Sequence, residues 1–395
     1  MRRTLRRRFY GMACGAFMLM AASQTAFPQD HQLARTPPMG WNDCFRFACW
    51  EKSDAIIRAN ADALVSSGMR AAGYEYVNVD GCWQGQRDAK GFLHPNERFP
   101  DMKALGDYLH SKGLKFGLYS TPGPKDCEDF EGSFGHEEQD AQTFAAWGVD
   151  YLKYDWCTAG SVYKPEEMPA AYRKMYDAIR RTGRPMVYSL CQYGLRAVWR
   201  WGPEVGANLW RTTTDIATPN YLAGDYYQVT LVGFQQNGLE KFAGPGRWND
   251  PDILQIGLHK MNHDEARTQM ALWCILAAPL LAGNDLPSML KDTRDILTNP
   301  EVIAVDQDSL GVQGHRVGQE GPLEVWMKPL ADGSKAVGLF NRSEGELPMS
   351  VRFADIGAGP SAHVRNLWER KDLGTLIGSY TANVPRHGVV LIKVK

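Results

Sequence analysis

Short apolar runs alternate with amphipathic stretches along the chain from His31 to about Gly311. The runs occupy residues 74–79, 114–120, 151–154, 186–191, 208–213 and 280–282. Runs of this length are typical of strands, and their alternation with helical stretches predicts parallel βα units. Enough units fit in this range to close a (β/α)8 barrel. An open doubly wound sheet is the alternative, although no GxGxxG motif follows any of the runs.

The stretches between the runs have the periodicity of helices. In the first of them Ser53 is a candidate N-cap, Ile57, Ala61 and Leu64 fall on one face, and Gly68 ends the pattern. The same arrangement recurs over residues 101–112, 138–147 and 165–181. We therefore expect helices in all four segments.

The pattern changes after Gly311. Helical periodicity ends, and short alternating runs follow at residues 323–327, 335–340, 350–353 and 388–394, separated by Gly and Pro. Such runs are typical of a β-sandwich, here of about 80 residues. We therefore predict a barrel over residues 31–311 and an antiparallel β domain over residues 312–395.

Residues 1–30 have the composition of an export signal. A basic segment holds Arg2, Arg3, Arg6, Arg7 and Arg8, residues 10–22 are apolar, and small residues follow. The apolar segment is shorter than a membrane-spanning helix. We expect the signal to be cleaved and the protein to be periplasmic or secreted, by the general or the twin-arginine route. A retained N-terminal anchor is the alternative.

Composition and charge exclude several classes of function. The formal charge of −1 becomes −5 without residues 1–30, which carry five arginines and one aspartate, and it indicates no nucleic-acid partner. Seven of the eight cysteines lie outside the signal, so at least one of them cannot form a disulfide within the chain. The nine histidines are scattered and no HExxH or CxxC motif occurs, so we expect no metal. The oligomeric state stays open and includes a homo-oligomer.

Acidic residues follow several of the predicted strands. They are Asp80, Asp155, Asp215 and, in the segment after Phe242, Asp250 and Asp252. A parallel barrel gathers the C-terminal ends of its strands on one face, where active sites lie. A single aspartate in such a place can simply cap the next helix. Strand ends that deliver carboxylates together, with Lys153 and Arg211 nearby, favour an active site.

Lys153 and Asp155 lie two positions apart on one predicted strand, so their side chains share a face. The ammonium group favours the ionised carboxylate, which is the form that a glycosidic nucleophile requires. A second carboxylic acid must protonate the leaving oxygen, and retaining glycosidases hold the two groups about 5 Å apart. The pattern alone leaves the choice of the pair open.

Eight segments resemble those of glycoside hydrolase family 27, the α-galactosidase and α-N-acetylgalactosaminidase group. They are residues 36–41 (TPPMGW), 73–80 (GYEYVNVD), 110–119 (HSKGLKFGLY), 140–150 (DAQTFAAWGVD), 151–155 (YLKYD), 208–211 (NLWR), 243–252 (AGPGRWNDPD) and 269–273 (QMALW). They occur in order across nearly the whole predicted barrel, whereas the C-terminal segment matches only in size and position. The resemblance implies a (β/α)8 barrel with an antiparallel β domain, hydrolysis with retention, and no cofactor.

The resemblance also assigns roles by position. Asp155 corresponds to the nucleophile and Asp215 to the acid/base. The implied substrate-binding positions are Asp80 (for the 4-hydroxyl of the sugar), Lys153 (for ring hydroxyls), Tyr119, Gln192, Arg211, Asp252, Trp41 and Gly81. The implied disulfides are Cys49–Cys82 and Cys127–Cys157, which leaves Cys44, Cys191 and Cys274 unassigned.

Three positions depart from the family pattern. The family has a second aspartate after the one at Asp80, which holds the 6-hydroxyl of the sugar, and this chain has Gly81 there. A tryptophan near the sugar is replaced by Cys44, and a glutamate or small residue near the 2-substituent by Gln192. Losing a charged acceptor for a hydroxyl costs about 1.5–3 kcal/mol of recognition. β-L-Arabinopyranose, which lacks the CH2OH group, would lose nothing.

Three hypotheses follow. The first is an α-galactosidase that acts on oligosaccharides or polysaccharide side chains, with another side chain in the role of the missing aspartate. The second is a β-L-arabinopyranosidase with the same mechanism. The third is a sugar-binding protein without activity, because barrel folds host unrelated functions; the retained Asp155 and Asp215 argue against it. Gln192 disfavours N-acetylgalactosamine.

Overall fold

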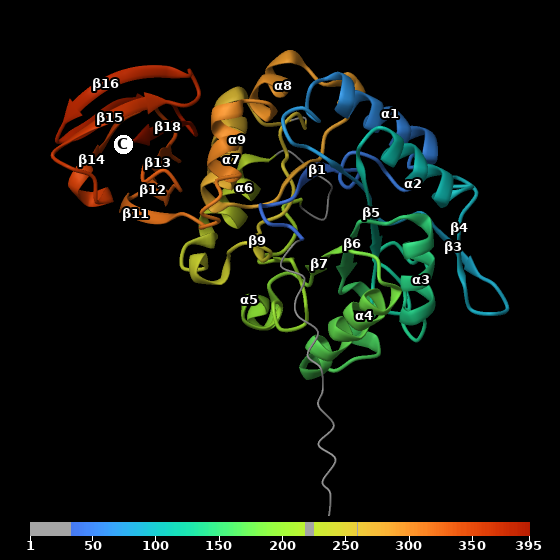
Figure 1. Ribbon diagram of the computed structural model, residues 1–395. Coiled ribbons are helices and arrows are strands. Elements are labelled where there is room, and N and C mark those ends of the chain that lie inside the picture. Colours follow the sequence, from blue (N-terminus) through green and yellow to red (C-terminus); the bar gives the residue numbers. More distant parts are fainter. Residues whose placement is uncertain (1–32, 218–224, 259) are drawn as a thin grey trace, which may run out of the picture.

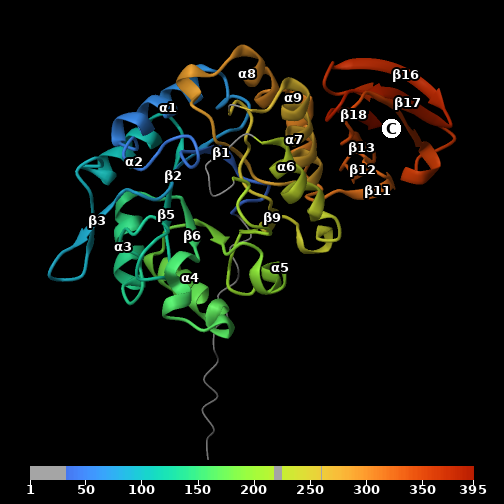
Figure 2. The ribbon, with the colours of Figure 1, turned by 180° about the vertical axis from the view of Figure 1, so that it is seen from behind.

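The computed structural model describes residues 33–217, 225–258 and 260–395, and the predicted export signal lies outside them. A barrel of strands and helices lies beside a smaller, all-β unit formed by the end of the chain (Figures 1 and 2). Within the described ranges, no helix is long and apolar enough to span a membrane.

Eight parallel strands form one sheet in the order β10-β1-β2-β5-β6-β7-β8-β9. They are β1 (Met39–Asn42), β2 (Tyr76–Val79), β5 (Lys115–Ser120), β6 (Tyr151–Asp155), β7 (Val187–Cys191), β8 (Leu209–Arg211), β9 (Trp248–Asp250) and β10 (Leu280–Ala282). The sheet closes because Leu254, just beyond β9, forms a parallel bridge with Ala282 of β10. The predicted (β/α)8 barrel is therefore confirmed, and the open sheet is wrong.

Helices surround the sheet (Figure 1). They are α1 (Asp54–Ser66), α2 (Met102–Ser111), α3 (Glu137–Trp147), α4 (Met168–Thr182), α5 (Val198–Trp201), α6 (Tyr226–Gly233), α7 (His263–Leu276), α8 (Lys291–Leu297) and α9 (Pro300–Asp306). Periodicity predicted the first four, and α1 and α2 begin where Ser53 and Asp101 accept backbone N–H groups. Helix α4 starts later than predicted, because a short 3-10 turn occupies Pro165–Glu167. A hairpin of β3 (Gln84–Arg87) and β4 (Leu93–Pro95) precedes α2.

The C-terminal unit is an antiparallel sandwich, as predicted. Its larger sheet has the order β11-β12-β13-β18-β15-β16, and β14 and β17 pair opposite it. The strands are β11 (His315–Glu320), β12 (Leu323–Pro329), β13 (Lys335–Asn341), β14 (Leu347–Arg352), β15 (Ser361–Asn366), β16 (Lys371–Ile377), β17 (Ser379–Val384) and β18 (Val389–Val394). Val337, Phe353 and Ile392 are buried in its core. The four predicted runs correspond to β12, β13, β14 and β18, whereas β11, β15, β16 and β17 were not predicted.

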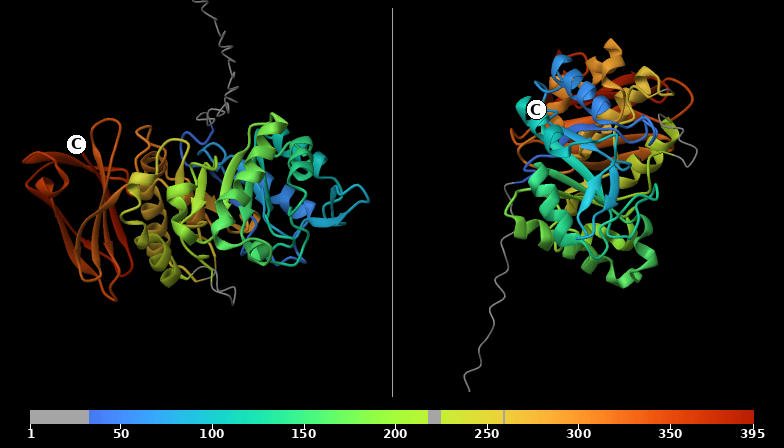
Figure 3. Two further views of the ribbon diagram at one scale, coloured as in Figure 1. Left: turned by 90° about the horizontal axis from the view of Figure 1, so that it is seen from below. Right: turned by 90° about the vertical axis from the view of Figure 1, so that its right-hand side faces the viewer.

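Helix α7 joins the two units. Nearly all of its residues are buried, because it packs against α9 on the barrel and against β12, β13 and β18 of the sandwich. Lys328 of β12 is also buried, and its ammonium donates to the backbone oxygens of Val305 at 2.6 Å and Cys274 at 3.3 Å. Two views from other sides show the sandwich against the same flank of the barrel (Figure 3). The sandwich is thus packed on the barrel through a shared buried core.

Candidate active site

The residues singled out in the sequence lie at the C-terminal ends of the parallel strands. Tyr119 is in β5, Lys153 and Asp155 end β6, Arg211 ends β8, and Asp80, Asp215 and Asp252 follow β2, β8 and β9. Adjacent parallel strands end at the same edge of a barrel, so these side chains converge on one face. The convergence produces two groups, each consisting of one cation shared by two carboxylates.

Lys153 is the cation of the first group. Its Nζ lies 2.8 Å from Oδ2 of Asp80 and 3.9 Å from Oδ2 of Asp155. Burial alone would raise the pKa of Asp80, but the ammonium groups of Lys153 and Lys52 outweigh it and hold that pKa below its usual value. Asp80 is therefore a fixed anion that can only accept hydrogen bonds.

Asp155 is buried and makes a second contact that the sequence did not indicate. The hydroxyl of Tyr193 donates to Oδ1 of Asp155 at 2.7 Å. Burial raises the pKa of Asp155, Lys153 and Tyr193 oppose that rise, and the charge of Asp215 adds to it. The site thus positions Asp155 with one hydrogen bond and one nearby ammonium charge while removing it from water.

Tyr193 was missed because its backbone is unusual. It follows β7 with φ of +62°, in the left-handed region that aromatic residues rarely adopt. This turn carries the phenol back toward Asp155 of β6, and no sequence pattern indicates it. Such strained residues cluster at functional sites. Asp252 also has a positive φ of 93°.

Arg211 is the cation of the second group. Its guanidinium lies 3.0 Å from Oδ1 of Asp215 and 2.9 Å from Oδ2 of Asp252. Burial raises the pKa of Asp252 to about 6, although Arg211 opposes the rise. Asp252 also accepts the backbone N–H of Ile216 at 2.8 Å, which fixes the chain just after Asp215. The side chain of Asp215 is 47% exposed, so it faces the solvent side of the site.

Polar residues at the end of β1 and just after it support Asp80. Oδ1 of Asp43 accepts the backbone N–H of Asp80 at 2.8 Å, and Asn42 donates to Oδ2 of Asp80 at 3.1 Å. Lys52 lies 3.2 Å from Asp43, so the buried carboxylate has a cation partner. The sequence did not indicate these residues, because Gly40 and Asn42 interrupt the apolar pattern of β1.

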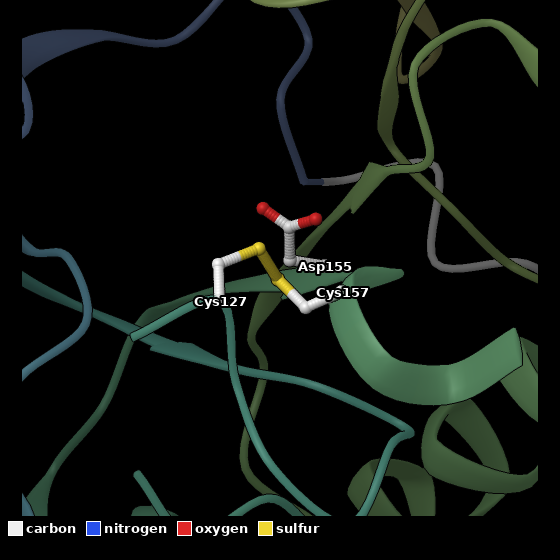
Figure 4. A group of neighbouring side chains, drawn as sticks. All are labelled: Cys127, Asp155 and Cys157. Carbon is white, nitrogen blue, oxygen red and sulfur yellow. A yellow bond between two sulfur atoms is a disulfide. The ribbon is translucent and has the colours of Figure 1, made fainter. Parts of the chain in front are cut away.

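The disulfide between Cys127 and Cys157 lies directly beside the carboxylate of Asp155 (Figure 4). A second disulfide joins Cys49 to Cys82, next in sequence to Gly81. Among the described residues, Cys127, Asp155 and Cys157 are close enough together to suggest metal ligands. The two sulfur atoms are bonded to each other, however, and do not offer thiolates. The disulfide instead anchors the loop after β5 to the loop after β6.

Replacing Cys127 and Cys157 together by serine is expected to lower the free energy of unfolding by about 3–4 kcal/mol. The bridge closes a loop of 30 residues in the unfolded chain, and its loss returns that conformational freedom. Urea unfolding of the variant and of the wild type, both without reductant, measures the difference. A difference below about 1 kcal/mol would contradict the expectation.

Two of the anticipated substrate-binding residues lie away from open space. Trp41 is fully buried, and its indole N–H donates to the backbone oxygen of Asn284 at 2.7 Å. Gln192 is also fully buried, and its Oε1 accepts the backbone N–H of Gly194 at 3.1 Å. Cys44 lines a narrow cavity together with Lys153, Arg211 and Asp252.

A parallel barrel whose strand ends present two ion-paired groups of carboxylates has the arrangement of a glycoside hydrolase of the two-carboxylate class. The chain belongs to the α-galactosidase A family, whose model matches residues 36–308. The model for the α-galactosidase C-terminal β-sandwich domain matches residues 320–394.

Known proteins resemble the chain over nearly its whole length. It is 42% identical to α-galactosidase A from Cellvibrio japonicus, over 95% of this chain and 96% of that protein. The crystal structure of α-galactosidase I from Mortierella vinacea has a TM-score of 0.86 and 34% identity, and covers 92% of this chain and 98% of its own. A family 27 β-L-arabinopyranosidase from Geobacillus stearothermophilus has a TM-score of 0.81 and 27% identity, over 92% and 97%.

Proposed function

We propose that this protein is a retaining α-galactosidase that releases terminal α-D-galactose from oligosaccharides or polysaccharide side chains, with Asp155 as nucleophile and Asp215 as acid/base. The observation that supports the proposal is the pair of ion groups, one with the buried Asp155 and the other with the half-exposed Asp215, whose charges interact. The relatives' names support galactose as the sugar, because the identity to the α-galactosidases from Cellvibrio japonicus (42%) and Mortierella vinacea (34%) exceeds the 27% identity to the arabinopyranosidase.

In the first step a carboxylate oxygen of Asp155 attacks the anomeric carbon of the galactosyl residue. The bond from that carbon to the leaving oxygen breaks, and the leaving oxygen takes a proton from Asp215. Lys153 and Tyr193 bind the attacking carboxylate through its two oxygens, which orients it without protonating it. The product of this step is a galactosyl ester on Asp155.

In the second step water attacks the same carbon. Asp215, now a carboxylate, takes a proton from the water, and the ester bond breaks to restore the carboxylate of Asp155. Half-exposed Asp215 can meet both the leaving group and the incoming water, because Arg211 holds it at the solvent side. Two displacements at one carbon give galactose with the α configuration retained.

The sugar is bound by groups whose charges are fixed in advance. We assign the 4-hydroxyl to the anionic Asp80 and further ring hydroxyls to Lys153, since these two groups already pair at 2.8 Å. Arg211 and Asp252 line the same narrow cavity as Lys153. We assign these sugar-binding and catalytic residues to a catalytic domain of residues 31–311, followed by the β domain of residues 312–395. We further propose that residues 1–30 are cleaved during export.

Gly81 favours a second candidate, the arabinopyranosidase, because no carboxylate follows Asp80. Comparing kcat/KM for nitrophenyl α-D-galactopyranoside and nitrophenyl β-L-arabinopyranoside tests the choice. We expect the galactoside to be preferred about tenfold or more, as a bound CH2OH group should be worth at least one hydrogen bond. A preference for the arabinopyranoside would change the substrate and leave the two-aspartate mechanism in place.

A further inference from the structure

The carboxylate of Asp126, which belongs to a different loop, lies close to Gly81, the position that has no side chain after Asp80. A Cβ atom at Gly81 would be 3.4 Å from Oδ2 of Asp126 and 3.5 Å from the ring of Tyr119. Asp126 belongs to the loop after β5, which the Cys127–Cys157 disulfide fixes beside Asp155. The space that a side chain at position 81 would enter is therefore bounded by Asp126 and Tyr119.

Asp126 is a buried anion, and its oxygen nearest Gly81 can accept a further hydrogen bond. Its side chain is held through Oδ1, which accepts the backbone N–H groups of Glu128 and Phe130, both at 2.9 Å. Oδ2 accepts one hydrogen bond, from the amide of Gln84 at 3.0 Å. A carboxylate oxygen accepts two hydrogen bonds. Oδ2, the oxygen nearest Gly81, therefore retains an unused acceptor position.

Asp126 has no ion-pair partner among the described residues. No Lys, Arg or His side chain in the described part of the chain forms a salt bridge with its carboxylate, which is only 2% exposed. Burial raises the pKa of Asp126, and the charge of Asp80 adds to the rise. The Oε1 atom of Gln84 is also buried, and no described group donates to it. Buried acceptors without donors cost free energy, so this pair is suited to a ligand that brings a hydroxyl.

We propose that Asp126 binds the 6-hydroxyl of the galactosyl residue and is the specificity-determining residue that replaces a carboxylate at position 81. The hydroxyl donates to Oδ2 of Asp126 while Asp80 accepts from the 4-hydroxyl. The two carboxylates lie close enough for their charges to interact, as neighbouring hydroxyls of one sugar require. This inference rests on the proposed function and names how its sugar is recognised.

The test compares galactose with its 6-deoxy form. The wild type and Asp126→Asn are assayed on nitrophenyl α-D-galactopyranoside and nitrophenyl α-D-fucopyranoside, which differ only in the 6-hydroxyl. We expect Asp126→Asn to lower the ratio of the two kcat/KM values by about tenfold to a hundredfold, the effect of one hydrogen bond to a charged acceptor. Asparagine keeps an oxygen for the two backbone N–H groups, and its amide nitrogen can donate to Oε1 of Gln84.

Two further variants separate recognition from folding. Asp129→Asn, on the exposed part of the same loop, removes the same charge and should leave the ratio unchanged. Gly81→Asp added to Asp126→Asn should restore most of the ratio, because a Cβ atom fits at position 81. If Asp126→Asn slows both substrates equally, or leaves the ratio unchanged, the inference is wrong and the proposed function stands. A wild type that hydrolyses neither glycoside contradicts the proposed function itself.

Discussion

Asp155→Asn is expected to lower kcat on nitrophenyl α-D-galactopyranoside by about 10^4-fold or more, the scale on which nucleophile removal acts in other hydrolases. The amide is not a nucleophile, and Asp155 is the carboxylate at the end of β6 that both the ammonium of Lys153 and the phenol of Tyr193 contact. The substitution preserves size and leaves an acceptor for Tyr193. We therefore expect the loss in kcat without unfolding.

The control for this prediction is thermal unfolding of the same preparation. Burial raises the pKa of Asp155, so its ionised form is costly in the folded protein and neutral asparagine should not destabilise it. In the acid range, below the pKa of an ordinary aspartate, both proteins carry a neutral group here and should differ little. Activity above about 1% of the wild type in the Asn variant would show that another group attacks the sugar.

Asp215→Asn is expected to lower kcat/KM on an unactivated oligosaccharide such as raffinose by about 10^3–10^4-fold, because the leaving oxygen then receives no proton. A dinitrophenyl galactoside needs no such proton, so its first step should survive. The variant should therefore release a burst of dinitrophenol. Slow turnover should follow, because water must then hydrolyse the galactosyl ester without a general base.

The matched control is Asp252→Asn, which removes the other carboxylate bound to Arg211. Asp252 is buried and should affect binding of both substrates alike, without dependence on the leaving group. Equal losses on the activated and the unactivated substrate in Asp215→Asn would contradict its role as acid. If instead Asp252→Asn loses more activity on the unactivated substrate than on the activated one, Asp252 would be the acid.

The sequence was most informative for the strands that end at acidic residues. The apolar runs located β2, β5, β6, β7, β8 and β10, and the aspartates at or after the ends of β2, β6 and β8 could be placed on one face. The sequence was least informative for α7, because contact with both the barrel and the sandwich removes the polar face that identifies a surface helix.

The rest of the site depends on tertiary contacts. Tyr193 reaches Asp155 through a left-handed turn, and Asn42 and Asp43 reach Asp80 across neighbouring strands. Asp126 approaches Gly81 from a different loop. No spacing along the chain reveals such contacts, because they are fixed by how loops pack in three dimensions. The same packing buries Gln192, whose expected place at the sugar stays untested.

The most direct test of the account is to identify the residue that carries the sugar between the two steps. Asp215→Asn, mixed with the dinitrophenyl galactoside and quenched after the burst, should be digested and mapped by mass spectrometry. The account predicts a galactosyl ester on the peptide that contains Asp155 and on that residue within it. A galactosyl group on another residue, or none at the height of the burst, would contradict the two-aspartate mechanism.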